Sequence, residues 1–478
     1  MRNANGSGHE QRRQTDGPGK DEVNRMNDFR KTAQEMLEFI RISPTCFHAV
    51  ANIGRMLEAA GFQQLQEKEE WKLEKGGRYY TERNDSSVIA FAIPEKEVGI
   101  RGFHMAAAHS DSPCFKIKEK PELTVEEHYL RLNTEKYGGM ILSTWLDRPL
   151  SIAGRLAVKN GNGIDGRLVN IDRDLCVIPN VAIHMNREMN KGVEYNPQVD
   201  LLPLLADVSF DEYDTHTTYD AQNASENAEE QPETVEKPTL AALAAEAAGV
   251  DAETILGEDL FLYTRQEGKM IGAKGEFVLS PRLDDLQSAF ALTKAFTEST
   301  PAEYINLCAV FDNEEVGSGT RQGADSTFLE DTLQRITEGL QEGHSTYLRW
   351  VADSFLISAD NAHAVHPNHP EKADPANRPY LNGGIVIKYH GSQKYTTDGI
   401  SAAKMKDYCE RAKVPYQTYA NRSDIAGGST LGNISTAHVS VSSVDIGLPQ
   451  LAMHSAVETA GMKDTEYAVR ALKEFWGE

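Results

Sequence analysis

Residues 305–320, INLCAVFDNEEVGSGT, join an apolar run to two adjacent glutamates and two glycines. The run Ile305–Phe311 has the length and composition of a buried strand. Glu314 and Glu315 follow it almost at once, and burying neighbouring carboxylates costs free energy unless a cation or hydrogen-bond donors compensate for their charge. A solvated loop tip is the ordinary interpretation of such a pair. The rest of the chain must decide between that loop and a binding site.

Length and charge bound the class of protein. The chain has 478 residues and a formal net charge of -23, so two domains are the natural expectation. The acidic balance argues against nucleic acid and against an anionic membrane as partners, because both need a basic surface. The chain shows no apolar stretch of membrane-spanning length and no secretory signal. We therefore expect a cytoplasmic protein.

The cysteines restrict the kind of metal site. They are odd in number, scattered and without a CxxC pair, which fits packed thiols in a reducing compartment and argues against a disulfide frame or a thiolate zinc site. Any metal must therefore be held by His, Asp and Glu. The five cysteines are Cys46, Cys114, Cys176, Cys308 and Cys409.

Patterning predicts an α/β domain built from both ends of the chain. Residues 28–61 have the spacing of two helices, broken at Ser43 and Pro44, and short apolar runs at 88–93 and 104–108 are strand candidates. After residue 255 apolar strands again alternate with helical stretches, which implies a mixed sheet flanked by helices. We expect residues 1–27 to be a disordered extension.

The middle of the chain reads as a separate β-rich module. Residues 155–171, RLAVKNGNGIDGRLVNI, surround a Gly/Asn turn and predict a hairpin. Residues 211–238 are acidic and poor in apolar groups, so we expect a flexible loop there. The expected organisation is a catalytic domain formed by residues 28–115 and 255–478, with an inserted β-rich oligomerisation domain at 116–254.

Side chains able to bind metal follow several of the strand-like runs. In open α/β sheets, sites form at the carboxyl ends of strands. Each candidate alone is weak, because a histidine after a strand is usually a core or loop residue and an aspartate before a helix is usually a cap. Their coincidence is the signal. The candidates are His109 and Asp111, Asp284 and Asp285, Glu314 and Glu315, Asp360 and His363, and His454, which precedes a capping-box pattern, Ser455-x-x-Glu458, that predicts a helix start.

Two imidazoles and several carboxylates fit two divalent ions that share one bridging carboxylate. Nitrogen and oxygen donors of this kind suit zinc, with cobalt and manganese as alternatives. We expect Glu314 and Glu315 to lie in an extended segment with their side chains on opposite sides, so that one binds metal and the other faces the water between the ions. That carboxylate would take a proton as the water attacks a carbonyl.

Seven motifs in series resemble the aspartyl aminopeptidase family of dinuclear zinc exopeptidases, from about residue 28 to the end. They are AAHSDSPCFKIK (107–118), YGGMILSTWLDRPLSIAGR (137–155), SPRLDDLQSAF (280–290), FDNEEVGSGTRQGADS (311–326), SADNAHAVHPN (358–368), RSDIAGGSTLG (422–432) and MHSAVETAG (453–461).

The resemblance implies a role for each residue that matches a family motif. His109 and Asp360 would bind one zinc, His454 and Glu315 the other, and Asp284 would bridge both. Glu314 would be the general base, and Asp111 would support His109. His363 would contact substrate, Lys388 and Tyr395 would line the pocket for the first side chain, and His184 would reach into the active site of a neighbouring subunit.

The resemblance further implies a homo-oligomer, a dodecamer built from dimers through the inserted domain. A cationic Lys388 in a partly dry pocket would favour an acidic substrate side chain by roughly 1.5–3 kcal/mol. The expected activity is removal of N-terminal Asp or Glu from short peptides, through a metal-bridging water activated by Glu314. One alternative is a related dinuclear hydrolase that prefers apolar N-terminal residues, or that cleaves C-terminal residues or N-acyl groups. The other alternative is a scaffold protein without catalytic activity.

Four further residues look like candidates but have ordinary explanations. We expect His366 and His369 to shape a loop near the site, Asp147 to make structural hydrogen bonds, and His104 to lie in the core.

Overall fold

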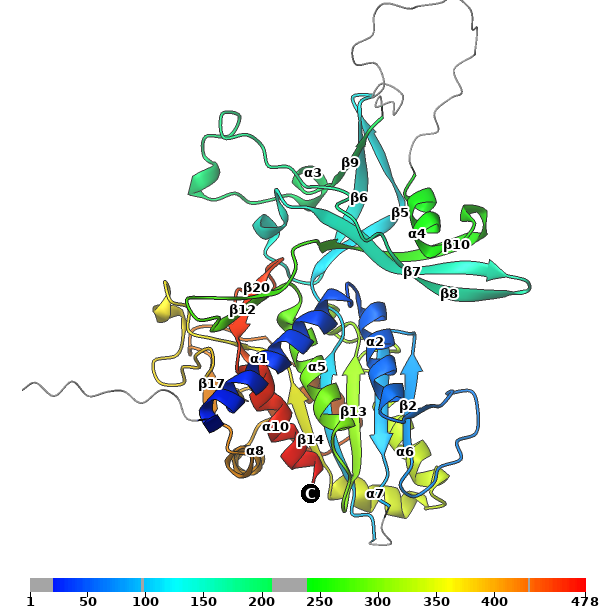
Figure 1. The fold of residues 1–478 in the computed structure, drawn as a ribbon, viewed down its shortest axis with the longest axis vertical. Helices are drawn as coiled ribbons and strands as arrows, with labels where there is room; N and C mark the ends of the chain where they lie inside the picture. The colour runs from blue at the N-terminus through cyan, green and yellow to red at the C-terminus, as the bar shows by residue number, and fades with distance from the viewer. Residues whose placement is uncertain (1–19, 96–98, 209–238, 429) are drawn as a thin grey trace, which may run out of the picture.

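The computed structural model describes residues 20–95, 99–208, 239–428 and 430–478, which form an α/β body with a second, antiparallel sheet above it (Figure 1). The helices are α1 (Lys20–Arg41), α2 (Cys46–Ala59), α3 (Pro197–Asp200), α4 (Leu240–Ala248), α5 (Leu283–Thr297), α6 (Phe328–Gly339), α7 (His344–Ala352), α8 (Gly399–Ala412), α9 (Leu431–His438) and α10 (Asp464–Trp476). The short 3-10 turns used below are η1 (Leu142–Trp145) and η5 (Glu314–Val316).

The strands divide among three sheets. The nine-stranded sheet has the order β1 (Gln63–Gln64), β2 (Arg78–Arg83), β3 (Ser87–Ala92), β13 (Ile305–Phe311), β4 (Phe103–His109), β14 (Phe355–Ala359), β18 (Ser442–Gly447), β16 (Ile385–Tyr389) and β17 (Tyr416–Ala420). The six-stranded sheet has the order β8 (Gly163–Asn170), β7 (Leu150–Asn160), β10 (Ile255–Thr264), β5 (Cys114–Val125), β6 (Tyr129–Tyr137) and β9 (Leu204–Asp207). The five-stranded sheet has the order β11 (Lys269–Ile271), β12 (Phe277–Ser280), β20 (Glu458–Gly461), β19 (Pro449–Leu451) and β15 (Ala362–His363).

The nine-stranded sheet is covered by helices on both faces, which confirms the predicted mixed α/β architecture. Helices α1, α2, α5, α8 and α10 pack on one face, and α6, α7 and α9 pack on the other. Along β13, Cys308 and Val310 face the first group while Leu307 and Ala309 face the second. A strand buried on both faces must be apolar at every position, which explains its unbroken hydrophobic run.

The centre of this sheet is a parallel block whose carboxyl ends meet at one edge. β4 pairs in parallel with β13, with Phe311 opposite His109, and also in parallel with β14. β14 pairs in parallel with β18. The residues that follow β4, β13 and β14 therefore leave the sheet side by side, although they are far apart in the sequence.

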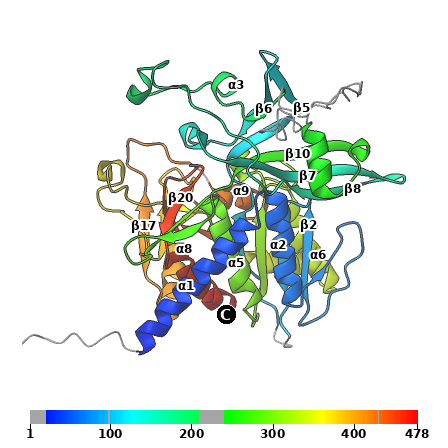
Figure 2. The ribbon, with the colours of Figure 1, turned by 45° about the horizontal axis from the view of Figure 1, so that its top comes forward.

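The six-stranded sheet stands over this same edge, because β4 leads almost directly into β5. Both views show it above the α/β body, with α4 against it (Figures 1 and 2). The hairpin predicted at residues 155–171 is present as β7 and β8, which pair from Ala153 opposite Asn170 to Asn160 opposite Gly163. The sheet has its own apolar core, which includes Phe115, Leu156 and Leu260.

Two expected boundaries differ in the structure. β10, which we expected to start the second part of the α/β domain, pairs with β7 and β5 in the six-stranded sheet, because Leu260 and Leu262 complete the apolar core there. Helix α1 begins at Lys20, inside the stretch expected to be disordered, and Met26 packs against the main core. The expected flexible loop at 211–238 and residues 1–19 lie outside the described residues. Within the described residues, no helix combines the length and apolarity needed to cross a membrane.

Candidate metal centre

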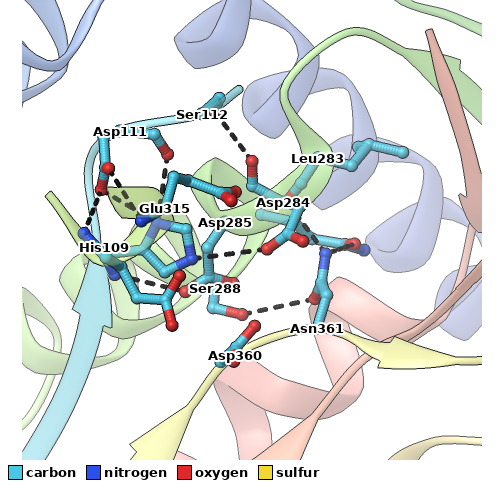
Figure 3. A network of polar contacts seen from close by, with 12 residues as sticks. His109, Asp111, Ser112, Leu283, Asp284, Asp285, Ser288, Glu315, Asp360 and Asn361 are labelled. Atoms are coloured by element: carbon cyan, nitrogen blue, oxygen red, sulfur yellow. Dashed lines mark hydrogen bonds and ion pairs between the residues drawn. The ribbon is translucent and has the colours of Figure 1, made fainter. Parts of the chain in front are cut away.

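The carboxyl edge of the parallel block gathers the candidate ligands from segments scattered along the chain (Figure 3). His109 ends β4, Asp360 follows β14 directly, and Asp284 lies in the first turn of α5. Glu315 lies in η5, just after β13, and His454 lies between β19 and β20. The structure brings these five residues together at one edge of the sheet, as the sequence analysis predicts.

Asp284 is at the centre of the cluster. Its Oδ1 lies 3.4 Å from Nε2 of His109, and its Oδ2 lies 3.4 Å from Nε2 of His454. Its side chain is only 3% exposed. The Nδ1 atoms of both histidines donate hydrogen bonds to carbonyl oxygens, those of Asp111 and Gly139, so each ring presents its Nε2 to the same carboxylate. One carboxylate between two imidazoles is the arrangement that a bridging ligand requires.

Two groups of donor atoms, each mutually within 4.8 Å, share this carboxylate. The first is His109, Asp284, Asp285 and Asp360, and the second is Asp284, Glu315 and His454. Asp285 was not assigned a role from the sequence. Its Oδ2 accepts a hydrogen bond from the backbone N–H of His109 at 3.3 Å, and its carboxylate supplies one donor atom to the first group.

The donor set and its unpaired atoms fit a pair of cations. Oδ1 of Asp285 and Oε1 of Glu315 are buried and have no hydrogen-bond partner among the residues that the structure describes. Unpaired carboxylate oxygens out of contact with water are costly, and a bound cation removes that cost. Imidazole nitrogens combined with carboxylate oxygens suit zinc, and cobalt or manganese would accept the same donors.

Crowding of charge perturbs the titration of the cluster. Burial, together with the nearby charges of Asp360 and Asp111, raises the pKa of Glu314 to about 7. Burial and Asp284 also raise the pKa of Glu315 well above its usual value. Burial lowers the pKa of His454, but its hydrogen bond to Asp284 and the charge of Glu315 outweigh this and raise it to about 10. Protons therefore compete with cations for this site.

Asp111 organises the turn that carries the two glutamates. Its Oδ1 and Oδ2 accept the backbone N–H groups of Glu314 and Glu315, each at 3.1 Å. The expectation of an extended segment is therefore wrong: Glu314–Val316 is a 3-10 turn, and both glutamates belong to one group of donor atoms with His109. The backbone turns here because one carboxylate collects two successive N–H groups.

Glu458 is a residue that the sequence interpretation missed. We expected it to complete a capping box, but strand β20 begins there and pairs with β12 and β19. Its carboxylate is 2% exposed and accepts the backbone N–H of His454 at 2.7 Å and that of Asp284 at 3.0 Å. It thus ties together the segments that carry the bridging carboxylate and one histidine. The motif alone cannot distinguish the two uses.

Lys388 and Tyr395 lie beside the cluster. The ammonium of Lys388 donates to the carbonyl of Asp360 at 2.7 Å, lies 3.5 Å from Oδ2 of the same residue and sits 5.1 Å from the ring centre of Tyr395. Lys388 is 2% exposed, so it is not a surface lysine on a strand. His363, on β15, is exposed and has its ring centre 6.1 Å from that of Tyr419.

The remaining candidates lie away from the cluster. His184 is exposed in the six-stranded module, which is the six-stranded sheet with the loops that join its strands. Within the described residues, it belongs to none of the groups of donor atoms. His104 is buried and stacks on Tyr304, as expected for a core residue. Asp147 accepts hydrogen bonds from the backbone and side chain of Asn180, and His366 and His369 are exposed loop residues.

Comparisons with known proteins agree along almost the whole chain. A model of the aminopeptidase I zinc metalloprotease family (M18) matches residues 39–476. A probable M18 family aminopeptidase 2 from Clostridium novyi is 46% identical over 448 residues, which cover 93% of this chain and 98% of the relative. The solved complex of Ape4 and Nbr1 contains a chain with a TM-score of 0.86 and 36% identity, covering 95% of this chain and 86% of that one. The mApe1 dodecamer from S. cerevisiae gives a TM-score of 0.77 at 26% identity, covering 94% and 97%.

The shared carboxylate leads to a prediction about metal content. If each of the two groups of donor atoms holds one ion, Asp284→Asn should lose both, because the groups share Asp284, whereas His454→Ala should lose only one. Elemental analysis after dialysis against zinc measures the ratio of metal to protein. Asp407→Asn, an exposed carboxylate on α8, is the control and should match the wild type. A full complement of metal in Asp284→Asn would contradict the bridging geometry.

Proposed function

The chain belongs to the M18 family of zinc metalloproteases, whose members are aminopeptidases, and we propose that it removes N-terminal Asp or Glu from short peptides with two zinc ions per subunit. The observation that carries this proposal is the carboxylate of Asp284 held between the imidazoles of His109 and His454. In the proposed assignment, His109, Asp360 and Asp284 hold one ion, and His454, Glu315 and Asp284 hold the other.

The chemistry divides between the ions and the protein. When bound, zinc supplies a Lewis acid that polarises a peptide carbonyl and lowers the pKa of water. Glu314 has the position of a general base, since it lies beside His109 but is not needed to complete either ligand group. Its carboxylate takes the proton of the attacking water and returns it to the amine as the peptide C–N bond breaks. Asp111 holds Glu314 in place through the backbone N–H.

The role of Glu314 predicts a variant that binds metal but does not turn over. Glu314→Gln should keep zinc and fold while losing about 10²- to 10⁴-fold in kcat, because the amide cannot accept the proton. Peptide turnover and zinc content should be measured on the same preparation. Glu127→Gln, an exposed glutamate between β5 and β6, should behave as the wild type. Near-normal turnover by Glu314→Gln would refute the assignment. Chelation should abolish wild-type turnover, and zinc should restore it.

Lys388 supports a preference for an acidic first residue. An ammonium has three N–H donors. Two point to the carbonyls of Asp360 and Asn361, at 2.7 and 3.4 Å, and the third would turn from Oδ2 of Asp360, 3.5 Å away, to a substrate carboxylate. The ammonium is buried beside the ring of Tyr395, where a charge-assisted hydrogen bond is stronger than in water. The alternative is a preference for peptides whose first residue is apolar. In that case the third N–H of Lys388 would contribute nothing to substrate binding.

Lys388→Met should therefore change selectivity. The ratio of kcat/KM for an Asp-leading peptide to that for a Leu-leading peptide should fall by about 10- to 150-fold, the equivalent of one charge-assisted hydrogen bond. A ratio is used because Lys388 also touches Asp360, and any loss at the metal centre affects both peptides alike. Lys404→Met, an exposed lysine on α8, is the matched control. An unchanged ratio would overturn the proposed role of Lys388. N-blocked and C-terminal substrates in the same panel should stay uncleaved.

We also propose that the enzyme works as a homo-oligomer, a dodecamer built from dimers, in the cytoplasm. Its structural relative mApe1 is a dodecamer. Around His184 the six-stranded module exposes Val181, Ile183 and Met185, the last with 82% of its surface accessible. Apolar side chains gathered in this way are typical of a covered interface. All five cysteines are free, and free thiols suit a reducing compartment. Nucleic acid and membrane are not proposed partners.

If His184 completes the site of a neighbouring subunit, two inactive variants should complement each other. His184→Ala and Glu314→Gln should each lose activity alone. After mixing equal amounts under conditions that exchange subunits, some sites pair an intact Glu314 with an intact His184, so activity should return to about a quarter of wild type by simple subunit statistics. Turnover before and after exchange measures this. Failure to regain activity, with exchange verified by mass, would place His184 outside the shared site.

A further inference from the structure

Three consecutive residues, 137–139, connect the six-stranded sheet to the metal centre; we call them the connecting segment. Tyr137 is the last residue of β6, and the chain continues beyond Gly139 into η1. Each of the three contacts a different part of the candidate metal centre. None carries a metal-binding side chain, so nothing in the ligand assignment above requires them.

Tyr137 holds Asp111. Its hydroxyl donates to Oδ2 of Asp111 at 2.7 Å and accepts from the side-chain amide of Asn313 at 2.8 Å. The carbonyl oxygen of Asp111 accepts a hydrogen bond from Nδ1–H of His109. Its carboxylate accepts hydrogen bonds from the backbone N–H groups of Glu314 and Glu315 in η5. The tyrosine therefore acts on the ligand His109 through Asp111.

Gly138 packs directly against Glu315. A Cβ atom at this position would lie 3.1 Å from Cβ of Glu315 and 3.3 Å from its carbonyl oxygen. The backbone is also left-handed, with φ of 79°. The left-handed conformation favours glycine, and an added Cβ would require the segment that carries Glu315 to shift by a few tenths of an ångström.

Gly139 orients the second histidine. Its carbonyl accepts Nδ1–H of His454 at 2.7 Å, and a little further along the chain the backbone N–H of Ile141 donates to the carbonyl of His454 at 2.9 Å. The side chain and the backbone of His454 are therefore both held by the same stretch of the six-stranded module. A fixed Nδ1–H leaves Nε2 free for a metal.

We propose that the connecting segment positions the ligands of both metal ions, so that the seating of the six-stranded module on the α/β body sets the zinc affinity of the site. This inference rests on the proposed function. Tyr137 positions His109 through Asp111, and Gly139 positions His454. Gly138, between them in the chain, packs against Glu315. Because binding and conformation are linked, zinc in turn strengthens the contact between the module and the body.

Tyr137→Phe tests the first contact, because it removes only the hydroxyl. In the full-length protein, zinc affinity measured by competition with a chromophoric chelator should fall by about 10- to 100-fold, the usual effect of losing the group behind a ligand. At subsaturating zinc, kcat should fall while KM for the peptide stays unchanged, and added zinc should restore part of kcat. Tyr129→Phe, at the exposed start of the same strand, is the matched control and should retain wild-type affinity.

Gly138→Ala tests the second contact and is paired with Gly161→Ala. Both glycines have positive φ, so both substitutions carry a similar backbone cost. At Gly161, in the turn between β7 and β8, an added Cβ would have no neighbour within 4 Å. Zinc affinity should therefore fall in Gly138→Ala and not in Gly161→Ala.

The wild-type protein offers a test that needs no variant to fold. Hydrogen exchange of peptides covering residues 137–145 should slow on addition of zinc alone, because the metal fixes His454 and with it the bond from Ile141. Unchanged zinc affinity in Tyr137→Phe and Gly138→Ala, or exchange that ignores zinc, overturns the positioning role. Wild-type protein that takes up no zinc would instead overturn the proposed function, so the two failures are distinguishable.

Discussion

Asp284, Asp285, Glu315 and Asp360 bring four carboxyl groups into a space with little access to water. Their mutual repulsion, added to the cost of burial, makes the site unfavourable as an isolated arrangement. The surrounding fold opposes this with two imidazoles, a buried ammonium and backbone N–H groups. The remaining unpaired oxygens are the places where cations would complete the balance. The geometry of the edge of the sheet thus depends on how negative charge is compensated there.

The parallel block and its helices could be predicted because local pattern and tertiary context agree. An apolar run such as Ile305–Phe311 is typical of a strand in a sheet that is covered on both faces. The side chains that follow the run then lie at the carboxyl edge of that sheet. The same reasoning predicts that His109 lies near Asp360 and Glu315, and the structure places it in a donor group with each of them. Motif resemblance added the residues that pattern alone leaves ambiguous, among them Asp284 rather than Asp285 as the proposed shared ligand.

The sequence did not predict the features that depend on contacts between residues far apart in the chain. Glu458 looks like a helix cap, yet its carboxylate bonds the backbones of two separate segments. Glu314 and Glu315 look extended, yet Asp111 draws their N–H groups into a turn. β10 looks like the return to the α/β domain, yet the apolar core of the six-stranded module needs Leu260 and Leu262. In each case a partner distant in sequence outweighs the local signal.

The order of the ligand-bearing segments along the chain has a consequence for biosynthesis. His109 precedes the six-stranded module, and Asp284, Glu315, Asp360 and His454 all follow it. A ribosome must therefore complete the module before a second ligand emerges, and it must extend past residue 454 before both proposed zinc positions exist. Every shorter nascent chain lacks an assembled hydrolytic centre. The topology itself delays proteolytic competence until translation is nearly finished.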